Sequence, residues 1–264
     1  MPRHAFYSHV TAASLHGIPL PPRLDSQLQP LNSISLDVSV PVGMVPATGA
    51  RIRSHRLRIA SEDIVESRGM RFTSAERTWC DLAALLTEEE LIAAGDFLVW
   101  RKRPPLLRLT PEALSLAIAR FEGRRGRPAL LRAAPRLSSR ADSPPESTIR
   151  VRAVDAGLPE PEVNEELWTV EGEFLAQPDL RWRRWFTTFD YEGDLHRTDP
   201  RQWEKDIARV PRLENAGYRH IRGSKADLRN STNLLGNIAM RLQDHGWMPP
   251  PRTPIRRILR SLGR

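Results

Sequence analysis

Apolar and polar side chains alternate along two stretches near the start of the chain. Residues 34–40 and 51–57 each place hydrophobic and polar residues in turn, which is typical of a strand with one buried face. The residues between these stretches are rich in proline, glycine and small polar side chains. The pattern predicts that residues 1–60 are loop-rich and that the two strands pair.

The period changes from strand-like to helical at residue 73. Thr73-x-x-Glu76 has the form of a capping box, and a second helical stretch runs from Glu88 to Trp100. Thr110-Pro111-Glu112 begins another helix, because proline is favoured at the first helical position. We therefore expect residues 73–121 to be largely helical.

The second half of the chain predicts an α-β-β-β-α-β-α order, in which the turn at residues 170–173 joins the first two strands of a meander. Proline after a serine starts its first helix, and Gly157 ends it. The expected elements are a helix over 143–154, strands over 163–170, 174–182 and 185–192, a helix from 200 to 216, a strand over 218–222 and a helix over 232–243.

An arginine-rich segment, interrupted by glycine and proline, covers residues 120–140. It predicts a linker with at most a short helix, and a solvated surface explains its charge more readily than a dedicated track for phosphates. We place a domain boundary near residue 141. The expected organisation is an α+β module over 1–140, an α/β domain over 141–248 and a basic, disordered tail over 249–264.

Charge is distributed unevenly along the chain. The total of +8 divides into +7 for residues 1–141, −4 for 142–248 and +5 for 249–264. Only three of the 40 basic residues are lysines, which favours phosphate contacts weakly, because genome composition produces the same bias. The basic ends of the chain, including Arg256, Arg257 and Arg260, are the candidate DNA contacts.

The composition also narrows the class of protein. The chain has one cysteine, Cys80, so it forms no internal disulfide and no multi-thiolate zinc site. No apolar run approaches the length of a membrane span, and the first residues do not have the pattern of a secretory leader. We expect a globular protein of the cytoplasm that does not enter a membrane.

Two acids of the second half are placed to meet. If the strands over 174–182 and 185–192 form a tight hairpin, opposite residues have numbers that sum to 369, and Asp179 then faces Asp190. Glu192 points to the same face, because side chains of a strand alternate. Acids on one face suggest Mg²⁺ or Mn²⁺. A register shifted by one residue would instead place one acid on the other face, and spacing alone leaves both readings open.

Glu146 and His196 have simpler explanations. Glu146 is the third residue of the expected helix at 143–154, where a carboxylate closes a capping box, and spacing alone favours that role. His196 lies in an expected loop, where it would donate to a phosphate or act as an acid, although a single loop histidine is more often exposed without a role.

An ordered set of motifs over residues 142–248 resembles the endonuclease-like domain allied to very-short-patch-repair enzymes, within the PD-(D/E)XK nuclease superfamily. The motifs are Asp142-Ser-Pro-Pro-Glu-Ser147, Gln177-Pro-Asp-Leu180, Phe189-Asp-Tyr-Glu-Gly-Asp-Leu-His196, Asp206-Ile-Ala-Arg209 and Ala216-Gly-Tyr-Arg-His-Ile-Arg222. The resemblance implies a restriction-endonuclease-like fold with an α-β-β-β-α-β core.

The resemblance also implies roles for individual residues. Glu146, Asp179 and Asp190 match the metal-binding acids, and Glu192 stands where relatives usually have aspartate before glycine. His196 matches the histidine that follows. Arg209 belongs to the helix motif, and with Gln202 it is a candidate nucleic-acid contact.

One expected cation is missing. The superfamily usually has lysine two residues after the acid of its third motif, and this chain has Glu192 there. Lys205 is the best substitute, because it lies on the following helix in a polar stripe with Gln202 and Arg209. A solvated lysine explains the same position, and this reading is favoured because surface lysines are the rule.

The first half has a less specific likeness. Ser8-His-Val-Thr-Ala-Ala-Ser-Leu-His-Gly-Ile-Pro-Leu20, Leu36-Asp-Val-Ser-Val-Pro41 and Phe72-Thr-Ser-Ala-Glu-Arg-Thr-Trp-Cys-Asp-Leu82 resemble AbiEi-type antitoxin and regulator proteins of actinobacteria. Two functions follow as hypotheses: metal-dependent hydrolysis of DNA, or DNA binding by an antitoxin-like regulator, with a toxin as partner, whose nuclease fold is a scaffold with weak or no activity.

Overall fold

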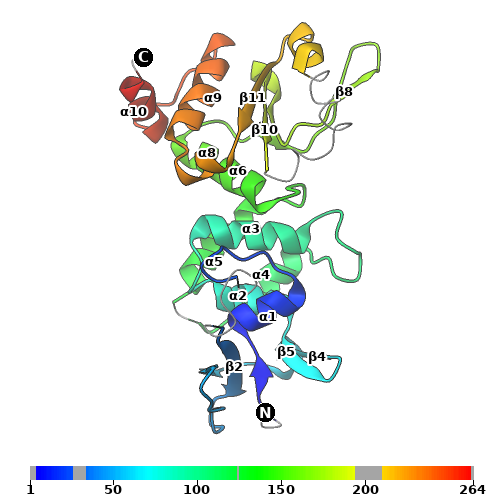
Figure 1. Ribbon diagram of the computed structural model, residues 1–264, viewed down its shortest axis with the longest axis vertical. Helices are drawn as coiled ribbons and strands as arrows, with labels where there is room; N and C mark the ends of the chain where they lie inside the picture. The colour runs from blue at the N-terminus through cyan, green and yellow to red at the C-terminus, as the bar shows by residue number, and fades with distance from the viewer. Residues whose placement is uncertain (1–3, 26–33, 124, 194–209, 263–264) are drawn as a thin grey trace. The chain divides into compact units, whose positions relative to one another are not determined.

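The computed structural model describes residues 4–25, 34–123, 125–193 and 210–262 (Figure 1). The chain divides into two compact units, residues 1–139 (unit 1) and residues 140–264 (unit 2), and the sequence places its boundary near residue 141. Each unit combines helices with a β-sheet, so the chain is of mixed α+β class.

Unit 1 contains a five-stranded sheet in the order β3-β2-β1-β5-β4. The two strands that the alternating pattern predicts do pair: β2 and β3 run parallel, from Leu36 opposite Ile52 to Pro41 opposite Leu57. β1 runs antiparallel to β2 and parallel to β5, and β4 and β5 form an antiparallel hairpin. The strands are β1 (Phe6–Tyr7), β2 (Leu36–Pro41), β3 (Ile52–Leu57), β4 (Ile64–Ser67) and β5 (Met70–Thr73).

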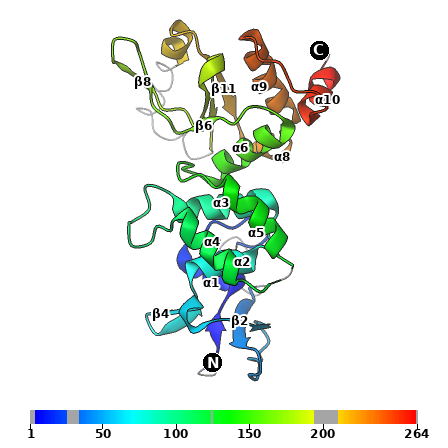
Figure 2. The same ribbon diagram turned by 180° about the vertical axis from the view of Figure 1, so that it is seen from behind.

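The helices of unit 1 gather at one end of this sheet in both views (Figures 1 and 2). They confirm a largely helical stretch after residue 73, with one correction. The helix that begins after residue 73 is capped by Ser74, whose hydroxyl accepts a hydrogen bond from the backbone amide of Arg77. The hydroxyl of Thr73 is hydrogen-bonded to that of Thr78 instead. The helices are α1 (His9–His16), α2 (Ala75–Leu82), α3 (Glu88–Val99), α4 (Pro111–Arg120) and α5 (Arg127–Ala133).

Residues 125–139 are folded into unit 1, so this segment is more ordered than the predicted linker, although its one α-helix is short as expected. α5 buries Leu130 and Ala133, and a 3₁₀ turn over Ala134–Arg136 follows it. The arginines of this segment hold the fold together: Arg127 donates to backbone carbonyls at the end of α4, and Arg132 pairs with Glu88 on α3. Proline at the start of α5 sets the helical φ, so the segment continues as structure.

Unit 2 begins with the helix that the sequence predicts. Ser143 caps α6, prolines occupy its first turn, and Gly157 ends it in the left-handed conformation that glycine adopts without strain. The elements are α6 (Pro144–Ala156), β6 (Glu162–Val163), β7 (Leu167–Trp168), β8 (Phe174–Ala176), β9 (Leu180–Trp182), β10 (Thr187–Tyr191), β11 (Arg219–Gly223), α8 (Lys225–Arg229), α9 (Thr232–Asp244) and α10 (Pro254–Ser261), with a 3₁₀ turn at Arg183–Trp185.

The predicted meander is divided between two sheets. The expected strand over 163–170 breaks at Asn164, which has a positive φ of 47°, and its second part pairs as β7 with β8 in a separate hairpin. The expected strand over 174–182 is likewise split at residues 177–179, where Pro178 removes a backbone donor. The main sheet has the order β11-β10-β9-β6, with β10 and β11 parallel and the other pairs antiparallel.

One face of this sheet carries the core of unit 2. Helices α9 and α10 lie on one side of β10 and β11, and the β7–β8 hairpin lies on the other (Figures 1 and 2). The core residues from the strands are Val163, Leu180, Trp182, Phe189 and Ile221, and they pack with Ile149, Ile238 and Leu242 from α6 and α9.

Residues 254–261 form a helix, which corrects the prediction of a disordered tail. Ile255 and Leu259 belong to the same core as the sheet, because apolar residues at this spacing form one helical face. Gly236 on α9 admits the helix, since a Cβ there would lie 2.2 Å from Leu262 and 3.2 Å from Ile258. The three arginines of the helix are exposed.

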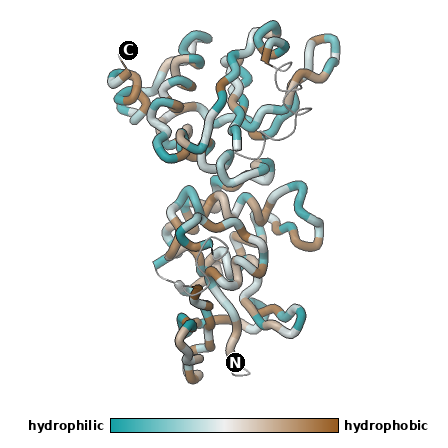
Figure 3. Tube along the Cα trace, viewed as in Figure 1, coloured by the Kyte–Doolittle hydropathy of each residue, from teal (hydrophilic) through white to brown (hydrophobic). Residues whose placement is uncertain are grey.

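Among the described residues, no helix is long and apolar enough to cross a membrane. Hydrophobic stretches along the tube are short and are interrupted by hydrophilic ones (Figure 3).

Candidate functional site

The face of the main sheet opposite the core is polar. Residues that are paired across neighbouring strands share a face, so Thr188 lies beside His220, and Asp190 lies beside Arg222. Arg181 on β9 faces Thr188 from the other side and forms an ion pair with Glu162 on β6. The core residues Leu180, Phe189 and Ile221 occupy alternate positions, so the strand period puts these polar residues on the other face.

The predicted register of the hairpin is confirmed. Leu180 lies opposite Phe189, and Trp182 lies opposite Thr187, so the numbers of each pair sum to 369 and the next opposite pair is Asp179 and Asp190. The side chain of each acid reaches the backbone of the other strand. The amide of Asp179 donates to Asp190 Oδ1 at 3.0 Å, and the amide of Tyr191 donates to Asp179 Oδ2 at 2.6 Å.

These hydrogen bonds explain how two carboxylates lie side by side where the strands end. Backbone N–H groups carry partial positive charge, and a carboxylate that accepts from them is stabilised in its charged form. Asp179 and Asp190 are neither fully buried nor fully exposed, so a ligand from solvent has access to this edge of the sheet.

His220 is a neighbour of this pair that the sequence analysis did not single out. Its Nδ1 lies 3.1 Å from the hydroxyl of Thr188, and its Nε2 lies 3.6 Å from Asp190 Oδ2. The ring is almost completely buried, which fixes its orientation. The sequence contains it within the motif Ala216-Gly-Tyr-Arg-His-Ile-Arg222 on the predicted fourth strand, where no role was assigned to it.

Glu192 does not join the acid pair. Its amide donates to the carbonyl of Gly223, and its carboxylate forms an ion pair of 2.8 Å with Arg222. Both side chains are about half exposed, so the pair contributes little to stability. Arg222 lies beside Asp190 on the next strand, so it brings a positive charge to the polar face of the sheet.

Glu146 is held as a helix cap. Its carboxylate accepts from the hydroxyl of Ser143 at 2.7 Å and from the amide of Asp142 at 2.9 Å. The side-chain amide of Asn164 donates a third hydrogen bond at 2.7 Å. Burial raises the pKa of Glu146 above its ordinary value, and these three donors oppose that rise.

Asn164 connects this cap to the acid pair, and the sequence analysis missed it. Its own amide donates to the carbonyl of Asp179 at 3.0 Å, while its side chain holds Glu146. The residue is buried and has a positive φ, a conformation that asparagine tolerates better than most residues. Glu146 thus acts on Asp179 through one intervening residue.

A divalent cation requires several oxygen ligands at one place. No group of three or more acid, histidine or cysteine side chains that could hold a metal is present in the described ranges. A site with three protein acids, with Glu146 as a third ligand, is therefore not formed there. Asp179 and Asp190 together still match the one or two carboxylates with which Mg²⁺ is usually bound, the other ligands being water and phosphate oxygens.

Four predicted site residues lie outside the described residues: His196, Gln202, Lys205 and Arg209. The three predicted DNA contacts of the C-terminal segment, Arg256, Arg257 and Arg260, lie within the described residues. Arg256 donates twice to the carbonyl of Pro249, and Arg257 and Arg260 are exposed on α10, so they form a basic surface on a folded helix.

A groove of about 1010 Å³ lies between the β7–β8 hairpin and the starts of β10 and β11. Its walls combine basic and aromatic side chains. Phe186 is 44% exposed although it has a positive φ of 44°, which is costly for an aromatic residue, and it lies 5.3 Å from the ring of Tyr218. The basic side chains are Arg183, Arg184 and Arg212, and Glu162, Glu171 and Glu173 also line the groove.

Comparisons of the chain with protein-family models, with curated proteins and with solved structures find no match in any of the three.

Proposed function

We propose that unit 2 is a metal-dependent endonuclease domain that hydrolyses phosphodiester bonds of DNA. One observation carries the proposal: Asp190 on β10 lies beside Asp179, the residue directly before β9, and each carboxylate accepts a hydrogen bond from a backbone amide of the other segment. The order of the main sheet supports it, because three antiparallel strands followed by a parallel one fit the α-β-β-β-α-β core that the resemblance to PD-(D/E)XK nucleases implies.

In this proposal Asp179 and Asp190 hold a Mg²⁺ or Mn²⁺ ion. When bound, such an ion polarises a phosphate and lowers the pKa of a water molecule. The remaining roles, which are to orient the acids and to supply positive charge, belong to residues of the chain itself. His220 orients Asp190, Asn164 holds the backbone of Asp179, and Arg222 supplies positive charge beside the acids.

Binding of the nucleic acid is assigned to the groove and the basic surfaces. Exposed aromatic rings stack with bases, and arginines contact phosphates without regard to sequence. Phe186 and Arg184 combine these properties at one end of the sheet. Arg257 and Arg260 on α10 add further cations beside residues 142–248, whose net charge is −4.

A second candidate function has its own support. Where related nucleases have lysine, this chain has Glu192, and its carboxylate is paired with Arg222. That pair neutralises the cation that would otherwise assist cleavage. On this reading the protein is a cytoplasmic DNA-binding regulator, as the likeness of unit 1 to antitoxin proteins suggests, and the nuclease fold serves as a scaffold.

Nicking of supercoiled plasmid by the full chain separates the two functions. We expect nicking in Mn²⁺ or Mg²⁺ that stops with EDTA and falls at least a hundredfold in Asp190→Asn, a change that preserves the shape of the side chain. Asp244→Asn, the same change at an exposed acid of α9, should leave the rate unaltered. DNA binding that is indifferent to EDTA, with no nicking by the wild-type chain in either metal, would instead establish the second function.

A further inference from the structure

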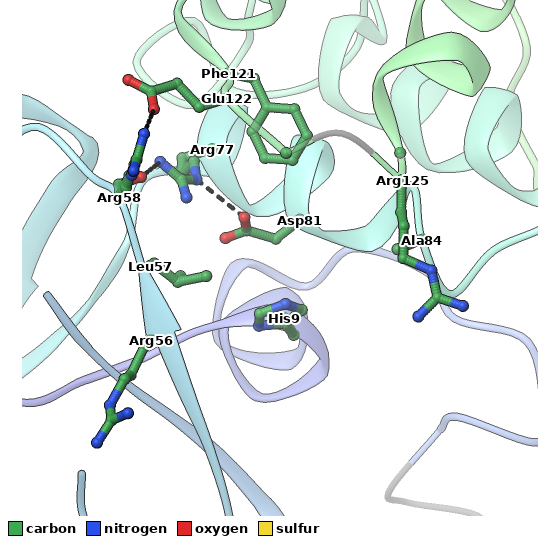
Figure 4. A pocket seen from close by; sticks show the side chains of 12 residues that line it. His9, Arg56, Leu57, Arg58, Arg77, Asp81, Ala84, Phe121, Glu122 and Arg125 are labelled. Carbon is green, nitrogen blue, oxygen red and sulfur yellow. Dashed lines mark hydrogen bonds and ion pairs between the residues drawn. The ribbon is translucent and has the colours of Figure 1, made fainter. Parts of the chain in front are cut away.

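Unit 1 has a hollow of its own, about 290 Å³ in volume. It is lined by the start of α1, the end of β3, α2 and the segment that joins α4 to α5 (Figure 4). A hollow of this size suits one small molecule or a single unit of a larger one. The side chains that decide its chemistry are His9, Arg56, Arg77, Asp81, Phe121 and Arg125.

Asp81 provides a hydrogen-bond acceptor that the described part of the chain does not use. Its Oδ1 accepts from Arg77 Nε at 2.9 Å, whereas its Oδ2 is buried and has no partner among the described residues. Only 2% of the side chain is exposed. A buried carboxylate oxygen without a donor is unfavourable, so a ligand that brings an N–H or O–H group stabilises this site.

The orientation of Asp81 is fixed by Arg77. The guanidinium of Arg77 also donates to the carbonyl of Arg58 at 3.0 Å and lies 3.6 Å from Asp63 Oδ2. Arg77 is thus held by three neighbouring residues, and it in turn holds Oδ1 of Asp81 in place. Figure 4 shows Asp81 between Arg77 and His9.

The rim of the hollow carries uncompensated positive charge. Arg58 is paired with Glu122, and Arg77 is paired with Asp81. Arg56 and Arg125 are exposed and form no ion pair with another described residue, and they lie on opposite sides of His9 in Figure 4. Cations around a hollow whose base accepts hydrogen bonds favour a ligand with an anionic group at one end.

His9 is held in a strained conformation at the same place. Its φ is +46°, and its ring is stacked on His55 with the centroids 4.1 Å apart. The hydroxyl of Ser8 lies 2.9 Å from Nδ1. Such conformations persist only where the surroundings impose them, and they gather at ligand sites. Burial lowers the pKa of His9 to about 4, so it adds no charge near neutral pH.

We propose that this hollow binds a nucleoside monophosphate unit, with an N–H of the base at Asp81 Oδ2 and the phosphate at Arg56 and Arg125. Phe121 supplies a flat apolar wall beside the base. A nucleotide combines the three properties that the hollow requires: a planar ring, a buried donor and an anion. The same chemistry occurs in a free mononucleotide and at the 5′-phosphorylated end of a strand. The proposal does not depend on the function of unit 2.

Calorimetric titration of the full chain tests the proposal. We expect at least one of AMP, GMP, CMP and UMP to bind tenfold more tightly than both its unphosphorylated nucleoside and ribose 5-phosphate. The double variant Arg56→Ala/Arg125→Ala should weaken that binding at least tenfold, while Arg229→Ala, which removes an exposed arginine of unit 2, should not. Asp81→Asn should abolish the preference for the nucleotide over ribose 5-phosphate.

Two further ligands identify the source. A 5′-phosphorylated trinucleotide that binds more tightly than the mononucleotide indicates a strand end, and the reverse order indicates a free nucleotide. The proposal is overturned if no monophosphate binds at millimolar concentration, if ribose 5-phosphate binds as tightly as the nucleotides, or if the double variant at Arg56 and Arg125 binds like the wild-type chain. That variant changes only exposed side chains, so it keeps the test independent of the fold.

Discussion

The acid pair of unit 2 and two buried acids of unit 1 are held by different kinds of hydrogen-bond donor. In unit 2, Asp179 and Asp190 each accept a hydrogen bond from a backbone amide of the neighbouring strand. In unit 1, Asp81 depends on the guanidinium of Arg77, and Asp37 depends on Arg53 and His55. Asp37 and Asp81 each keep one buried oxygen without a partner among the described residues.

The two arrangements respond differently when a neighbouring side chain is replaced. A backbone amide is fixed by the sheet and remains in place when a neighbouring side chain is changed. An ion pair in the interior loses its balance when one member is removed, because the other charge is then buried alone. Asp179 and Asp190 are therefore supported by the backbone of the sheet region, whereas Asp81 and Asp37 are supported by particular side chains.

The largest effect should follow from Arg77→Met. This change leaves Asp81 and Asp63 in the interior without their shared cation, and we expect a loss of about 3–5 kcal/mol in the stability of unit 1. Urea denaturation combined with hydrogen exchange of α2 amides would measure it. The matched control is Arg132→Met, since Arg132 is exposed and its partner Glu88 keeps a second ion pair with Arg136, and it should cost less than about 1 kcal/mol. Equal losses in both variants would contradict the comparison.

A smaller effect, visible only through pH, is expected of His9→Asn. The pKa of His9 is lowered to about 4 by burial and, next, by His55, Arg77 and Arg53 against the opposing charge of Asp37. As pH falls below about 6.5 the unfolded chain takes up a proton that the folded chain refuses until about 4, so His9 lowers stability in that window.

Asparagine tolerates the positive φ of residue 9 and does not titrate. The stability of His9→Asn relative to the wild-type chain should therefore rise by about 3 kcal/mol between neutral pH and pH 4. Denaturation midpoints of both proteins across that range give the difference directly. A difference that stays constant with pH would show that His9 is not held neutral.

The smallest of the three effects is expected in unit 2. Glu146→Gln places an amide N–H against one of the three donors that now bind the carboxylate, so we expect a loss of about 1–3 kcal/mol. Glu173→Gln, at an exposed acid, is the control. If Glu146 acts only through Asn164, any plasmid nicking should persist in Glu146→Gln at temperatures where the variant is folded, whereas complete loss would make it a direct participant.

Short-range patterns in the sequence predict several features of unit 2. The caps of α6 and the register that places Asp179 opposite Asp190 both depend on residues that are close in the sequence. The split of the first predicted strand was missed, because the positive φ of Asn164 depends on contacts with Arg140, Glu146 and Asp179. The helix at 254–261 was also missed, because charge and proline content outweighed the spacing of Ile255 and Leu259.

The hollow of unit 1 shows the limit of the same approach. Its lining includes residues 9, 56, 77, 81 and 121, which belong to four separate segments. No spacing rule connects a histidine at residue 9 with an aspartate at residue 81, so only the packing of α1, β3 and α2 brings them together. His220 was missed for a related reason, because only the parallel pairing of β11 with β10 brings it beside Thr188 and Asp190.

The docking of α10 has a consequence for the order in which the protein is made. Every element of unit 1 precedes residue 140, so this half can close while the rest of the chain is still being translated. Unit 2 must wait, because Ile255 and Leu259 fill the same interior as Ile149 on α6. At ordinary rates of translation the interval is on the order of 10 s. Throughout that time the core of unit 2 is incomplete, and the nascent chain would be most exposed to chaperones and proteases.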